Sequence, residues 1–460
     1  MDAQTVSTCV VVAGLGVSGA AAARGLAQGG ERVVVLEQRE RPVPPELVKL
    51  GVEVRFGDPA LPERTELVVT SPGWRPDHPL LLTAATLGVP VIGEVELAWR
   101  LRHAGAPPWL ALTGTNGKTT AVRMLAAILA AAGEHVRAVG NVGAPIVDAV
   151  LDPGDTTVLA VELSSFQLHW STGLAPAAAA ILNVAPDHID WHGSLAEYAR
   201  AKARIFAHAD TVIYNADDEW ATRLAEPHRD RTRVVGFTLD VPRPGQLGVV
   251  EDLLVDRAFV ADPVSSAEEL ASLGDVRPFA PHNVANALAA AALARSHGVP
   301  AGAVRRGLHT FVPDPHRIAH VARVREVDYV DDSKATNPHA AAASLAAFHS
   351  VVWIAGGQLK GAEVDDLVRR ASSRLRGAVL LGADRERIAQ ALARHAPNVP
   401  VLEVTGDDTG VMDRVVAEAA RLASPGDTVL LAPAGASLDM YAGYGARGEA
   451  FARAVRRLAE

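Results

Sequence analysis

The stretch "LALTGTNGKTTAVRML", residues 110–125, decides the fold of this chain. It runs an apolar, strand-like segment into a glycine-bearing turn and then into a helix that opens with Lys118, Thr119 and Thr120. Such a turn directs successive backbone N–H groups and a helix N-terminus at one point, which favours phosphate oxygens. The strict P-loop pattern has its first glycine where this chain has Leu112, so the match is partial.

We expect this turn to hold the phosphates of a nucleotide. Lys118 would reach the β and γ phosphates, and the Thr119 hydroxyl would bind Mg²⁺. The other residues expected to bind the nucleotide here are Gly114, Thr115, Asn116, Gly117 and Thr120. An ordinary strand-to-helix turn is the alternative.

A second glycine loop, "GLGVSG" at residues 14–19, also follows a strand and precedes a helix. It fits the dinucleotide pattern G-x-G-x-x-G, and Glu37 closes the next strand near the offset expected for an acidic ribose partner. Tight helix–strand packing without a cofactor is the alternative. A nicotinamide oxidoreductase would leave Lys118 without a role, whereas a protein that binds two different nucleotides would use both loops.

Length and composition narrow the class of protein. A chain of 460 residues with 49% hydrophobic and 21% charged residues is too long for one core and typical of globular proteins. The formal charge of -9, with scattered basic residues, predicts no nucleic-acid partner. No signal peptide or membrane-spanning run is recognisable, and the single cysteine, Cys9, is interpreted as a small buried side chain. We expect a cytoplasmic protein.

Strand-like and helical stretches alternate in three regions, which predicts an α/β fold with mainly parallel sheets. The first region contains "TCVVVAG" (8–14) and "RVVVL" (32–36). The second begins at 109–113 and continues through the runs at 157–165, 177–185 and 211–218 to a helix at about 283–296. "FVPDPHR" (311–317) reads as a linker to the third region, and segment 240–275 has no clear pattern.

Lysine is rare in this chain. It occurs at Lys49, Lys118, Lys202, Lys334 and Lys360, and the other 39 basic residues are arginine. Because ammonium and guanidinium groups differ in shape, hydration and reactivity, a lysine kept against this bias is a candidate for chemistry that arginine cannot perform.

Polar residues at the ends of two central strands suggest a metal site beside the P-loop-like turn. Glu162 of "ELSSFQ" would bring a carboxylate to the metal held by Thr119, and a neutral His188 of "NVAPDHID" would help to hold a hard cation. His188, Asp190 and His192 could also be zinc ligands, but their i, i+2, i+4 spacing in a predicted loop is only a weak indication of a zinc site. His192 is interpreted as a solvated loop residue.

Lys202 lies in "YARAKARIF", an amphipathic helical stretch that begins near Ser194. A free ammonium would repel a metal ion, and burial disfavours the charged form. The neutral amine can add CO₂ to become a carbamate, an anionic ligand with two oxygens that suits Mg²⁺. Arginine offers no such chemistry.

Two more lysines follow strands of the third region. Lys334 is in "DDSKATN" (331–337) and Lys360 in "GGQLKG" (356–361), so both could face one crevice at the strand ends. Exposed loop lysines without a role are the alternative.

Taken together, the motifs resemble those of the Mur ligases of peptidoglycan synthesis. They are "GTNGKTT", "ELSSFQL", "NVAPDHID", "YARAKARIF", "HNVANALAA", "PHR", "DDSKATNPHA" and "PAGASLDMYAGYGARG", and they span nearly the whole chain. The resemblance is greatest to the branch that adds D-glutamate to UDP-N-acetylmuramoyl-L-alanine through an acyl phosphate. It implies a Rossmann-like UDP-binding domain (1–96), a central P-loop ATPase domain (97–313) and a C-terminal Rossmann-like domain (314–460). We expect a monomer whose partners are these small substrates, with no nucleic acid and no membrane span.

The resemblance also implies ligands for individual residues. ATP would be held by the turn at 114–120 together with Asn286, Arg317 and Asp332. The UDP substrate would contact Leu15, Ser18, Glu37, Arg39, Ser71, Gly73, Asn141, Gln167 and His188. D-glutamate would contact Thr336, Lys360, Ser437 and Tyr444. Thr119 with Glu162 would bind one Mg²⁺, and carbamylated Lys202 with His188 a second.

Two departures and three rivals accompany this resemblance. The family has an acidic residue where this chain has Gln358, and an aspartate where it has Glu37. A relative that adds diaminopimelate would carry a "DNPR"-like run, which this sequence lacks, and ligases that add lysine, or glutamate to folate, are further relatives. A nicotinamide oxidoreductase would show no ATP turnover, and a nucleotide-hydrolysing switch would need no amino acid.

Overall fold

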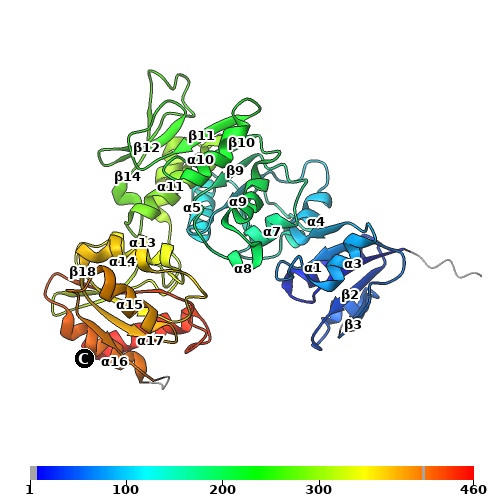
Figure 1. Ribbon diagram of the computed structural model, residues 1–460. Coiled ribbons are helices and arrows are strands. Elements are labelled where there is room, and N and C mark those ends of the chain that lie inside the picture. Colours follow the sequence, from blue (N-terminus) through cyan, green and yellow to red (C-terminus); the bar gives the residue numbers. More distant parts are fainter. Residues whose placement is uncertain (1–7, 58, 407–409, 460) are drawn as a thin grey trace, which may run out of the picture. The chain divides into compact units, whose positions relative to one another are not determined.

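The computed structural model describes residues 8–57, 59–406 and 410–459, and these ranges contain three β-sheets with helices on their faces (Figure 1). They divide into two compact units. The first unit holds the N-terminal and central sheets, and the second holds the C-terminal sheet with residues 185–187 and 273–284. None of the described helices is long and apolar enough to cross a membrane.

The N-terminal sheet is parallel throughout, in the order β3-β2-β1-β4-β5. The strand order reverses at β1, where open α/β sheets bind their ligands beyond the carboxyl ends of the strands. The strands are β1 (Cys9–Ala13), β2 (Val33–Glu37), β3 (Glu53–Phe56), β4 (Thr65–Thr70) and β5 (Val91–Gly93). The helices are α1 (Val17–Gln28), α2 (Pro45–Lys49), α3 (Pro79–Thr86) and α4 (Glu94–Arg100).

The central sheet has the order β14-β13-β12-β11-β10-β9-β6-β8-β7. It is parallel from β7 to β12, and β13 and β14 extend it in the antiparallel sense. Its strands are β6 (Trp109–Thr113), β7 (Val136–Gly140), β8 (Val158–Glu162), β9 (Ala178–Ile181), β10 (Thr211–Asn215), β11 (Arg233–Phe237), β12 (Gln246–Val250), β13 (Leu253–Asp256) and β14 (Glu268–Ser272).

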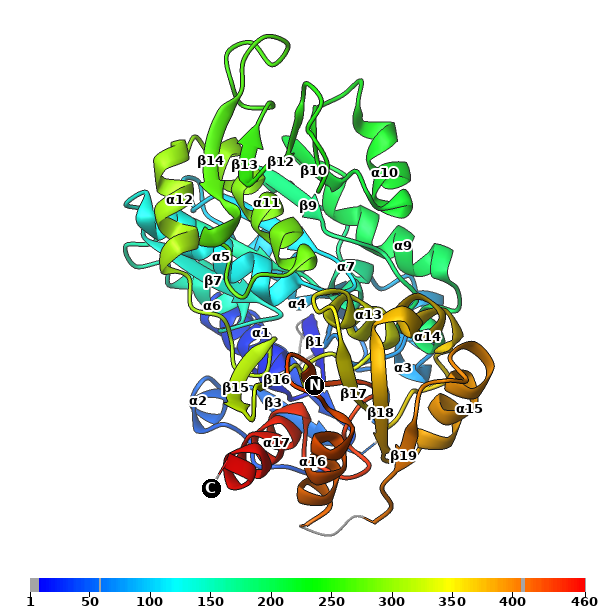
Figure 2. The ribbon, with the colours of Figure 1, turned by 90° about the vertical axis from the view of Figure 1, so that its left-hand side faces the viewer.

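Helices cover both faces of this sheet (Figure 2). They are α5 (Lys118–Ala131), α6 (Ile146–Leu151), α7 (Ser165–His169), α8 (Ile189–His192), α9 (Leu195–Ala203), α10 (Glu219–Ala225), α11 (Pro281–Ser296) and α12 (Ala301–Thr310). In Figure 2, α11 and α12 lie on one side of the strands, and α9 and α10 on the other. The residues Ile146, Leu168, Tyr198 and Ala221, from four helices, share one buried apolar cluster with Trp109.

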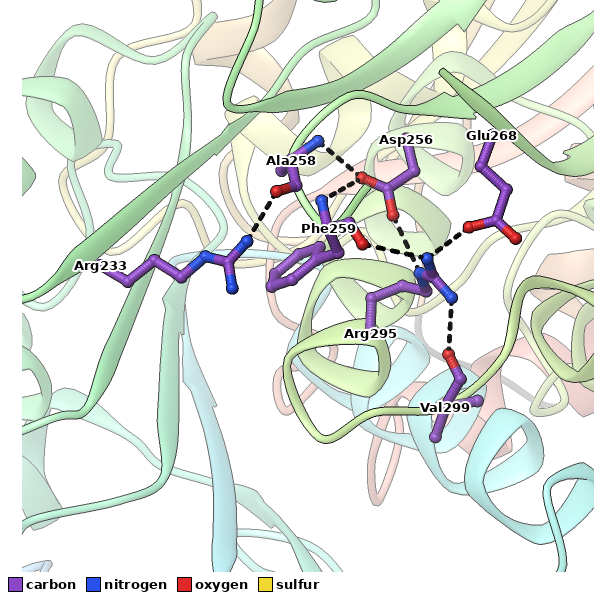
Figure 3. A network of polar contacts seen from close by, with 7 residues as sticks. All are labelled: Arg233, Asp256, Ala258, Phe259, Glu268, Arg295 and Val299. Atoms are coloured by element: carbon purple, nitrogen blue, oxygen red, sulfur yellow. Dashed lines mark hydrogen bonds and ion pairs between the residues drawn. The ribbon is translucent and has the colours of Figure 1, made fainter. Parts of the chain in front are cut away.

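The segment 240–275, whose sequence has no clear pattern, contains the strands β12, β13 and β14. A buried ion pair ties this extension to α11: Arg295 Nε donates to Asp256 Oδ2 at 2.9 Å, and Arg295 also pairs with Glu268 (Figure 3). The other Asp256 oxygen accepts the backbone N–H groups of Ala258 and Phe259. Since Asp256 is fully buried, removal of Arg295 would leave an uncompensated charge.

The C-terminal sheet has the order β15-β16-β20-β17-β18-β19, and only β15 pairs antiparallel within it. The strands are β15 (Ala319–Val324), β16 (Val327–Asp331), β17 (Val351–Gly356), β18 (Leu375–Leu381), β19 (Val401–Glu403) and β20 (Thr428–Ala434). The helices are α13 (Pro338–Ala346), α14 (Asp365–Ala371), α15 (Arg385–His395), α16 (Val411–Leu422) and α17 (Tyr444–Ala459). Short 3-10 helices lie at Arg204–Phe206, Glu226–His228, Leu273–Asp275 and Ser372–Arg374.

These elements confirm the predicted α/β class with mainly parallel sheets. They also place the polar motifs, because β16, β20 and β17 are neighbours, and so are β9, β6 and β8. The loops after the carboxyl ends of neighbouring parallel strands meet at one edge of a sheet. Within the central sheet, the loops after β6, β8 and β9 are therefore adjacent, and within the C-terminal sheet so are the loops after β16, β20 and β17.

Candidate functional site

The turn between β6 and α5 is built around Gly117. This residue adopts a left-handed conformation with φ of 84° at the N-cap of α5. A Cβ atom at this position would lie 2.3 Å from Asn286 Oδ1 of α11, so the turn requires glycine for its conformation and for its close contact with Asn286. The structure thus brings Asn286 to the turn, as the resemblance implied.

Asn183, at the end of β9, fixes the other side of the turn. Its side-chain oxygen accepts the Asn116 backbone N–H at 2.9 Å, and its amide donates to the Asn116 carbonyl at 3.1 Å. Its own carbonyl accepts the N–H of Thr115. The sequence motif "NVAPDHID" contained Asn183, but nothing in the sequence paired it with Asn116.

Two lysines converge on this turn from different helices. Lys118 of α5 donates to the carbonyl oxygens of Gly114 at 3.0 Å and Thr115 at 2.9 Å. Lys202 of α9 donates to the same Gly114 oxygen at 2.7 Å, lies over the Tyr198 ring and is 1% exposed. Two amines beside a glycine turn attract anionic groups, and only one of the two lysines is accessible at the surface.

Glu162 lies one strand away, because Leu112 of β6 pairs with Glu162 of β8. One carboxylate oxygen accepts the Asn141 amide at 2.8 Å, while the other, Oε2, is buried without a hydrogen-bond partner. A fully buried carboxylate oxygen that lacks a donor suits a divalent cation. Across the described residues, no group of three or more His, Cys, Asp or Glu side chains is arranged to hold a metal, so the fit of Mg²⁺ rests on Glu162, the Thr119 hydroxyl and oxygens of a bound phosphate.

Gln167 and His188 lie on two short helices beside these loops. The Gln167 side chain completes a capping box with Ser164, because its oxygen accepts the Ser164 N–H at 2.9 Å. His188 is exposed, begins α8 with a left-handed φ of 51°, and contacts the Phe166 ring at 4.7 Å between centroids. Phe166 therefore orients the imidazole that was predicted to approach a cation.

The interpretation of His192 as a solvated loop residue is wrong. His192 ends α8, is partly buried, stacks on Phe166 and lies 3.0 Å from the Ser165 hydroxyl through Nε2. Burial, with smaller effects of the neighbouring His169, His188 and Lys202, lowers the pKa of His192 to about 4. It is therefore a neutral packing residue at physiological pH.

The N-terminal glycine loop is held by Glu37. Its carboxylate accepts the backbone N–H of Leu15 at 2.7 Å and that of Arg39 at 3.1 Å. Burial raises the pKa of Glu37, but these N–H groups and the nearby Arg41 outweigh it, so the net shift is downward. Glu37 is thus a permanent anion, and its longer side chain reaches the loop from the end of β2.

A pocket of about 430 Å³ opens beside Glu37. Its walls include Trp74 and His78, whose rings are 4.3 Å apart, and Leu61. An aromatic and apolar pocket of this size next to a carboxylate fits a flat nucleoside base.

The glycines of this loop also serve close packing. A Cβ atom at Gly19 would lie 1.9 Å from the Gly14 carbonyl oxygen, and one at Gly14 would lie 2.8 Å from the Ser71 hydroxyl. Gly14 and Gly19 of "GLGVSG" are therefore required for close packing, and this packing does not decide whether the loop also binds a ligand. Ser71 Oγ is itself buried without a hydrogen-bond partner and points at this loop, while Ser18 is partly exposed and Arg39 and Gly73 are exposed.

The C-terminal sheet brings its predicted residues onto three neighbouring loops. Ser333 and Lys334 follow β16, and the Lys334 ammonium lies 3.9 Å from the centre of the Tyr444 ring. Arg447 is 2% exposed and joins two of the loops, because it donates to the Ser333 hydroxyl and carbonyl and to the Gly435 carbonyl. The other predicted residues here are Thr336, which is partly buried, Ser437, which is buried, and Lys360 and Tyr444, which are exposed.

Asp332, which directly follows β16, is a buried carboxyl group of this region. Burial raises its pKa to about 6, although the Ser344 hydroxyl, the Ile318 N–H and the charge of Arg317 oppose the shift. Arg317 also pairs with Asp314 at 3.6 Å. A carboxyl group whose pKa is raised this far by burial, beside an arginine, is a candidate for a functional site.

This shift predicts the effect of Asp332→Asn on stability. A raised pKa means that the folded state binds the proton more tightly, so the ionised Asp332 lowers stability as the pH rises from about 4 through 6. We expect the asparagine variant to gain up to about 3 kcal/mol in the free energy of unfolding at pH 8 and less at pH 4. Urea unfolding at both pH values measures this change in stability, with Asp328→Asn, on the preceding strand β16, as control. An equal change at both pH values would contradict the assignment.

Two glycine turns on parallel sheets, one with paired lysines and a carboxylate suited to a cation, define a nucleotide-binding α/β protein. A third sheet contributes a separate set of polar loops. The chain belongs to the Mur ligase family. Family models match it in three parts: "Mur ligase MurD-like, N-terminal domain" at residues 8–93, "Mur ligase middle domain" at 112–294, and "Mur ligase, glutamate ligase domain" at 316–435.

Individual relatives agree with this membership. A UDP-N-acetylmuramoylalanine--D-glutamate ligase of Thermobifida fusca is 63% identical, and the match covers 98% of each chain. One of the same name from Streptomyces avermitilis is 59% identical over 98% of each chain. Among solved structures, a UDP-N-acetylmuramate-alanine ligase of Thermotoga maritima shares the fold with a TM-score of 0.55 at 20% identity, covering 98% of this chain and 99% of that chain.

Proposed function

We propose that this protein is an ATP-dependent ligase that joins D-glutamate to UDP-N-acetylmuramoyl-L-alanine in peptidoglycan precursor synthesis. The relatives that match nearly the whole chain carry that name. The observation that carries the chemistry is the convergence of Lys118 and Lys202 on the Gly114 carbonyl beside the unpartnered oxygen of Glu162. Such a site suits a triphosphate with Mg²⁺ better than it suits a nicotinamide.

In the proposed reaction, the alanyl carboxylate attacks the γ phosphate of ATP and releases ADP. The D-glutamate amine then attacks the acyl carbon of the resulting acyl phosphate, and phosphate leaves. Lys118 would neutralise charge on the transferred group, and the backbone N–H groups of 114–120 would orient it. Mg²⁺, when bound, would supply Lewis-acid stabilisation of the phosphoryl oxygens.

The metal ligands proposed are Thr119 and Glu162 for one Mg²⁺, and His188 with carbamylated Lys202 for a second. The buried Glu162 and Lys202 support this assignment, because Glu162 ends the strand that pairs with β6 and Lys202 donates to the Gly114 carbonyl of the turn that follows β6. ATP would also contact Asn286, Arg317 and Asp332. The contact of Asn286 with Gly117 supports the first of these.

The UDP part of the substrate is assigned to the N-terminal glycine loop and the strand ends beside it. The residues assigned to it are Leu15, Ser18, Glu37, Arg39, Ser71 and Gly73, and Glu37 also lines the pocket. The pocket walled by Trp74 and His78 would receive the base. Asn141, Gln167 and His188 would extend along the diphosphate and sugar. The buried Ser71 hydroxyl, which has no hydrogen-bond partner in the structure, supports the assignment of a polar ligand to this loop.

D-glutamate is assigned to Thr336, Lys360, Ser437 and Tyr444 of the C-terminal loops, since its two carboxylates need cationic and hydroxyl partners. Boundaries at 1–96, 97–313 and 314–460, a monomeric state and a cytoplasmic location complete the proposal. Closure over the site would exclude water, because a wet acyl phosphate hydrolyses.

The proposal predicts that ADP release requires both the UDP substrate and D-glutamate. A coupled assay of the full chain with ATP, UDP-N-acetylmuramoyl-L-alanine and one amino acid at a time measures this. We expect turnover with D-glutamate and less than about 1% of it with L-glutamate, lysine or diaminopimelate, because a site that pairs both carboxylates and directs the amine rejects a ligand that leaves one partner unmatched. Lysine lacks the second carboxylate. L-glutamate has the opposite configuration, and diaminopimelate has a longer chain with a second ammonium, so neither can place its amine and both carboxylates on the same partners. Equal ADP release without any amino acid would instead identify a nucleotide hydrolase.

A further inference from the structure

Asp384 has no role in the proposed reaction, but it contacts the turn that carries Lys360. It lies between β18 and α15, and its carboxylate accepts the backbone N–H of Leu359 at 2.7 Å. Its own backbone N–H donates to the Gly357 carbonyl at 3.0 Å. Asp384 therefore binds the "GGQLKG" turn after β17 at two points, on either side of Gln358.

This contact replaces the one that Asp384 would ordinarily make. The residue occupies the N-cap of α15, where an aspartate side chain normally accepts a backbone N–H of its own helix. Here the side chain makes no capping bond and reaches the neighbouring loop instead. An N-cap hydrogen bond contributes about 1 kcal/mol to stability. Because α15 lacks this bond, we infer that the contact of Asp384 with the neighbouring loop has a role of its own.

A second carboxylate closes the connection to the loop after β20. Asp439 accepts the Ala383 N–H at 2.8 Å, and Gln358 and Ala436 exchange two backbone hydrogen bonds of 2.8 Å each. The backbones are so close that a Cβ atom at Gly357 would lie 2.1 Å from the Ala436 carbonyl oxygen. Three strand-end loops are thereby locked together.

Two of the residues assigned to D-glutamate, Lys360 and Ser437, directly follow residues of these hydrogen-bonded loops. Lys360 directly follows Leu359 and has a left-handed φ of 51°, an unfavourable conformation for lysine that its surroundings must impose. Ser437 directly follows Ala436 and is 3% exposed. Fixing Leu359 and Ala436 therefore fixes the backbone on which Lys360 and Ser437 are carried.

We propose that Asp384 is a positioning residue for the incoming amino acid, which acts by holding the Lys360 turn against the Ser437 loop. The inference rests on the proposed function, because it takes Lys360 as a ligand of the D-glutamate carboxylate. Gln358 contributes its backbone to the contact with the Ser437 loop, and the carboxylate that binds this turn is that of Asp384.

The test is a steady-state comparison of Asp384→Ala and Asp384→Asn in the full chain. We expect the alanine variant to raise the KM for D-glutamate about 10- to 100-fold, because displacement of a binding group by about 1 Å has effects of up to this size. The KM values for ATP and for the UDP substrate should stay within about twofold. The asparagine variant keeps an acceptor oxygen and should recover most of the loss, and it serves as the test if the alanine variant does not fold.

Asp427→Ala is the matched control. Asp427 is also buried and accepts a backbone N–H, that of Ser424 at 2.8 Å, but it precedes β20 at the opposite end of the strands. It should lower thermal stability without a selective change in the KM for D-glutamate. In the double variant Asp384→Ala/Lys360→Met, the KM should equal that of Lys360→Met alone, because Asp384 acts through Lys360.

An unchanged KM for D-glutamate in Asp384→Ala, an equal rise in all three KM values, or an equal rise in Asp427→Ala would overturn the positioning role. If the unmodified protein does not consume D-glutamate at all, the proposed function fails instead. The two failures are therefore distinguishable in one set of measurements.

Discussion

Lys118→Met is expected to lower ATP-dependent product formation by about 10³-fold, the loss typical of removing one preorganised group that stabilises transition-state charge. Methionine preserves the length and much of the volume of the side chain but carries no charge. In the structure, Lys118 Nζ is held by two carbonyls of its own turn, at 3.0 Å from Gly114 O and 2.9 Å from Thr115 O. The ammonium therefore already lies at the turn where the phosphates would bind, and the loss should fall mainly on kcat.

Lys49→Met is the matched control, because Lys49 is one of the few lysines of the chain and lies exposed at the end of α2. It should leave kcat unchanged. Thermal unfolding separates a catalytic from a structural effect, since the two hydrogen bonds lost in Lys118→Met are worth only about 1 kcal/mol each. If Lys118→Met keeps kcat within tenfold of the unmodified protein while folded, the turn does not act on the γ phosphate.

The sequence predicted buried parallel strands well and the antiparallel additions poorly. Runs such as "TCVVVAG" and "RVVVL" consist mainly of β-branched and apolar residues because both faces of the strand are buried, and β1 and β2 lie within a residue of the expected bounds. The β15–β16 hairpin turns at Arg325 and Glu326, which both have positive φ. Asn-Gly or Asp-Gly is the usual signal for such a turn, and two charged residues give no such signal.

For the candidate site, too, one part could be predicted from the sequence and another could not. Which side chains follow a strand is a local property, so Glu162 and Lys118 could be placed at strand ends from their motifs alone. Which of them meet depends on strand order. Asn183 reaches Asn116 only because β9 pairs with β6, and His192 becomes a packing residue only because Phe166 of another segment stacks on it. Contacts of this kind have no signature in a single sequence.

Lys202→Ala is the other variant for which a large loss is expected, about 10²- to 10³-fold in kcat, because it removes a proposed anionic ligand of Mg²⁺. Lys202 is 1% exposed, donates to Gly114 O at 2.7 Å and lies 3.4 Å from the Thr113 hydroxyl. It therefore sits on the carbonyl side of the same turn that Lys118 occupies. A carbamate at this position would bring two oxygens to the metal, whereas the ammonium brings a charge of the wrong sign.

The two charge states make opposite predictions for Lys202→Arg. If the lysine acted as a cation, arginine would retain much of the activity, and added carboxylates would have no effect on Lys202→Ala. If it acts as a carbamate, arginine should be as inactive as alanine, and formate or acetate should restore part of the activity of Lys202→Ala by filling the vacated volume. Added carboxylates should not help Lys202→Arg, because its side chain occupies that volume.

A measurement independent of turnover distinguishes these cases directly. Protein equilibrated with ¹³C-labelled bicarbonate should show a carbamate resonance that is absent from both Lys202 variants and present in Lys49→Met, which controls for modification of an exposed lysine. Loss of activity in Lys202→Ala without carboxylate rescue and without the resonance would assign Lys202 to the folding of the turn. Since Lys202 bonds to Gly114 O, that result would also predict a lower melting temperature for Lys202→Ala than for Lys118→Met, because the bond lost is the more deeply buried one.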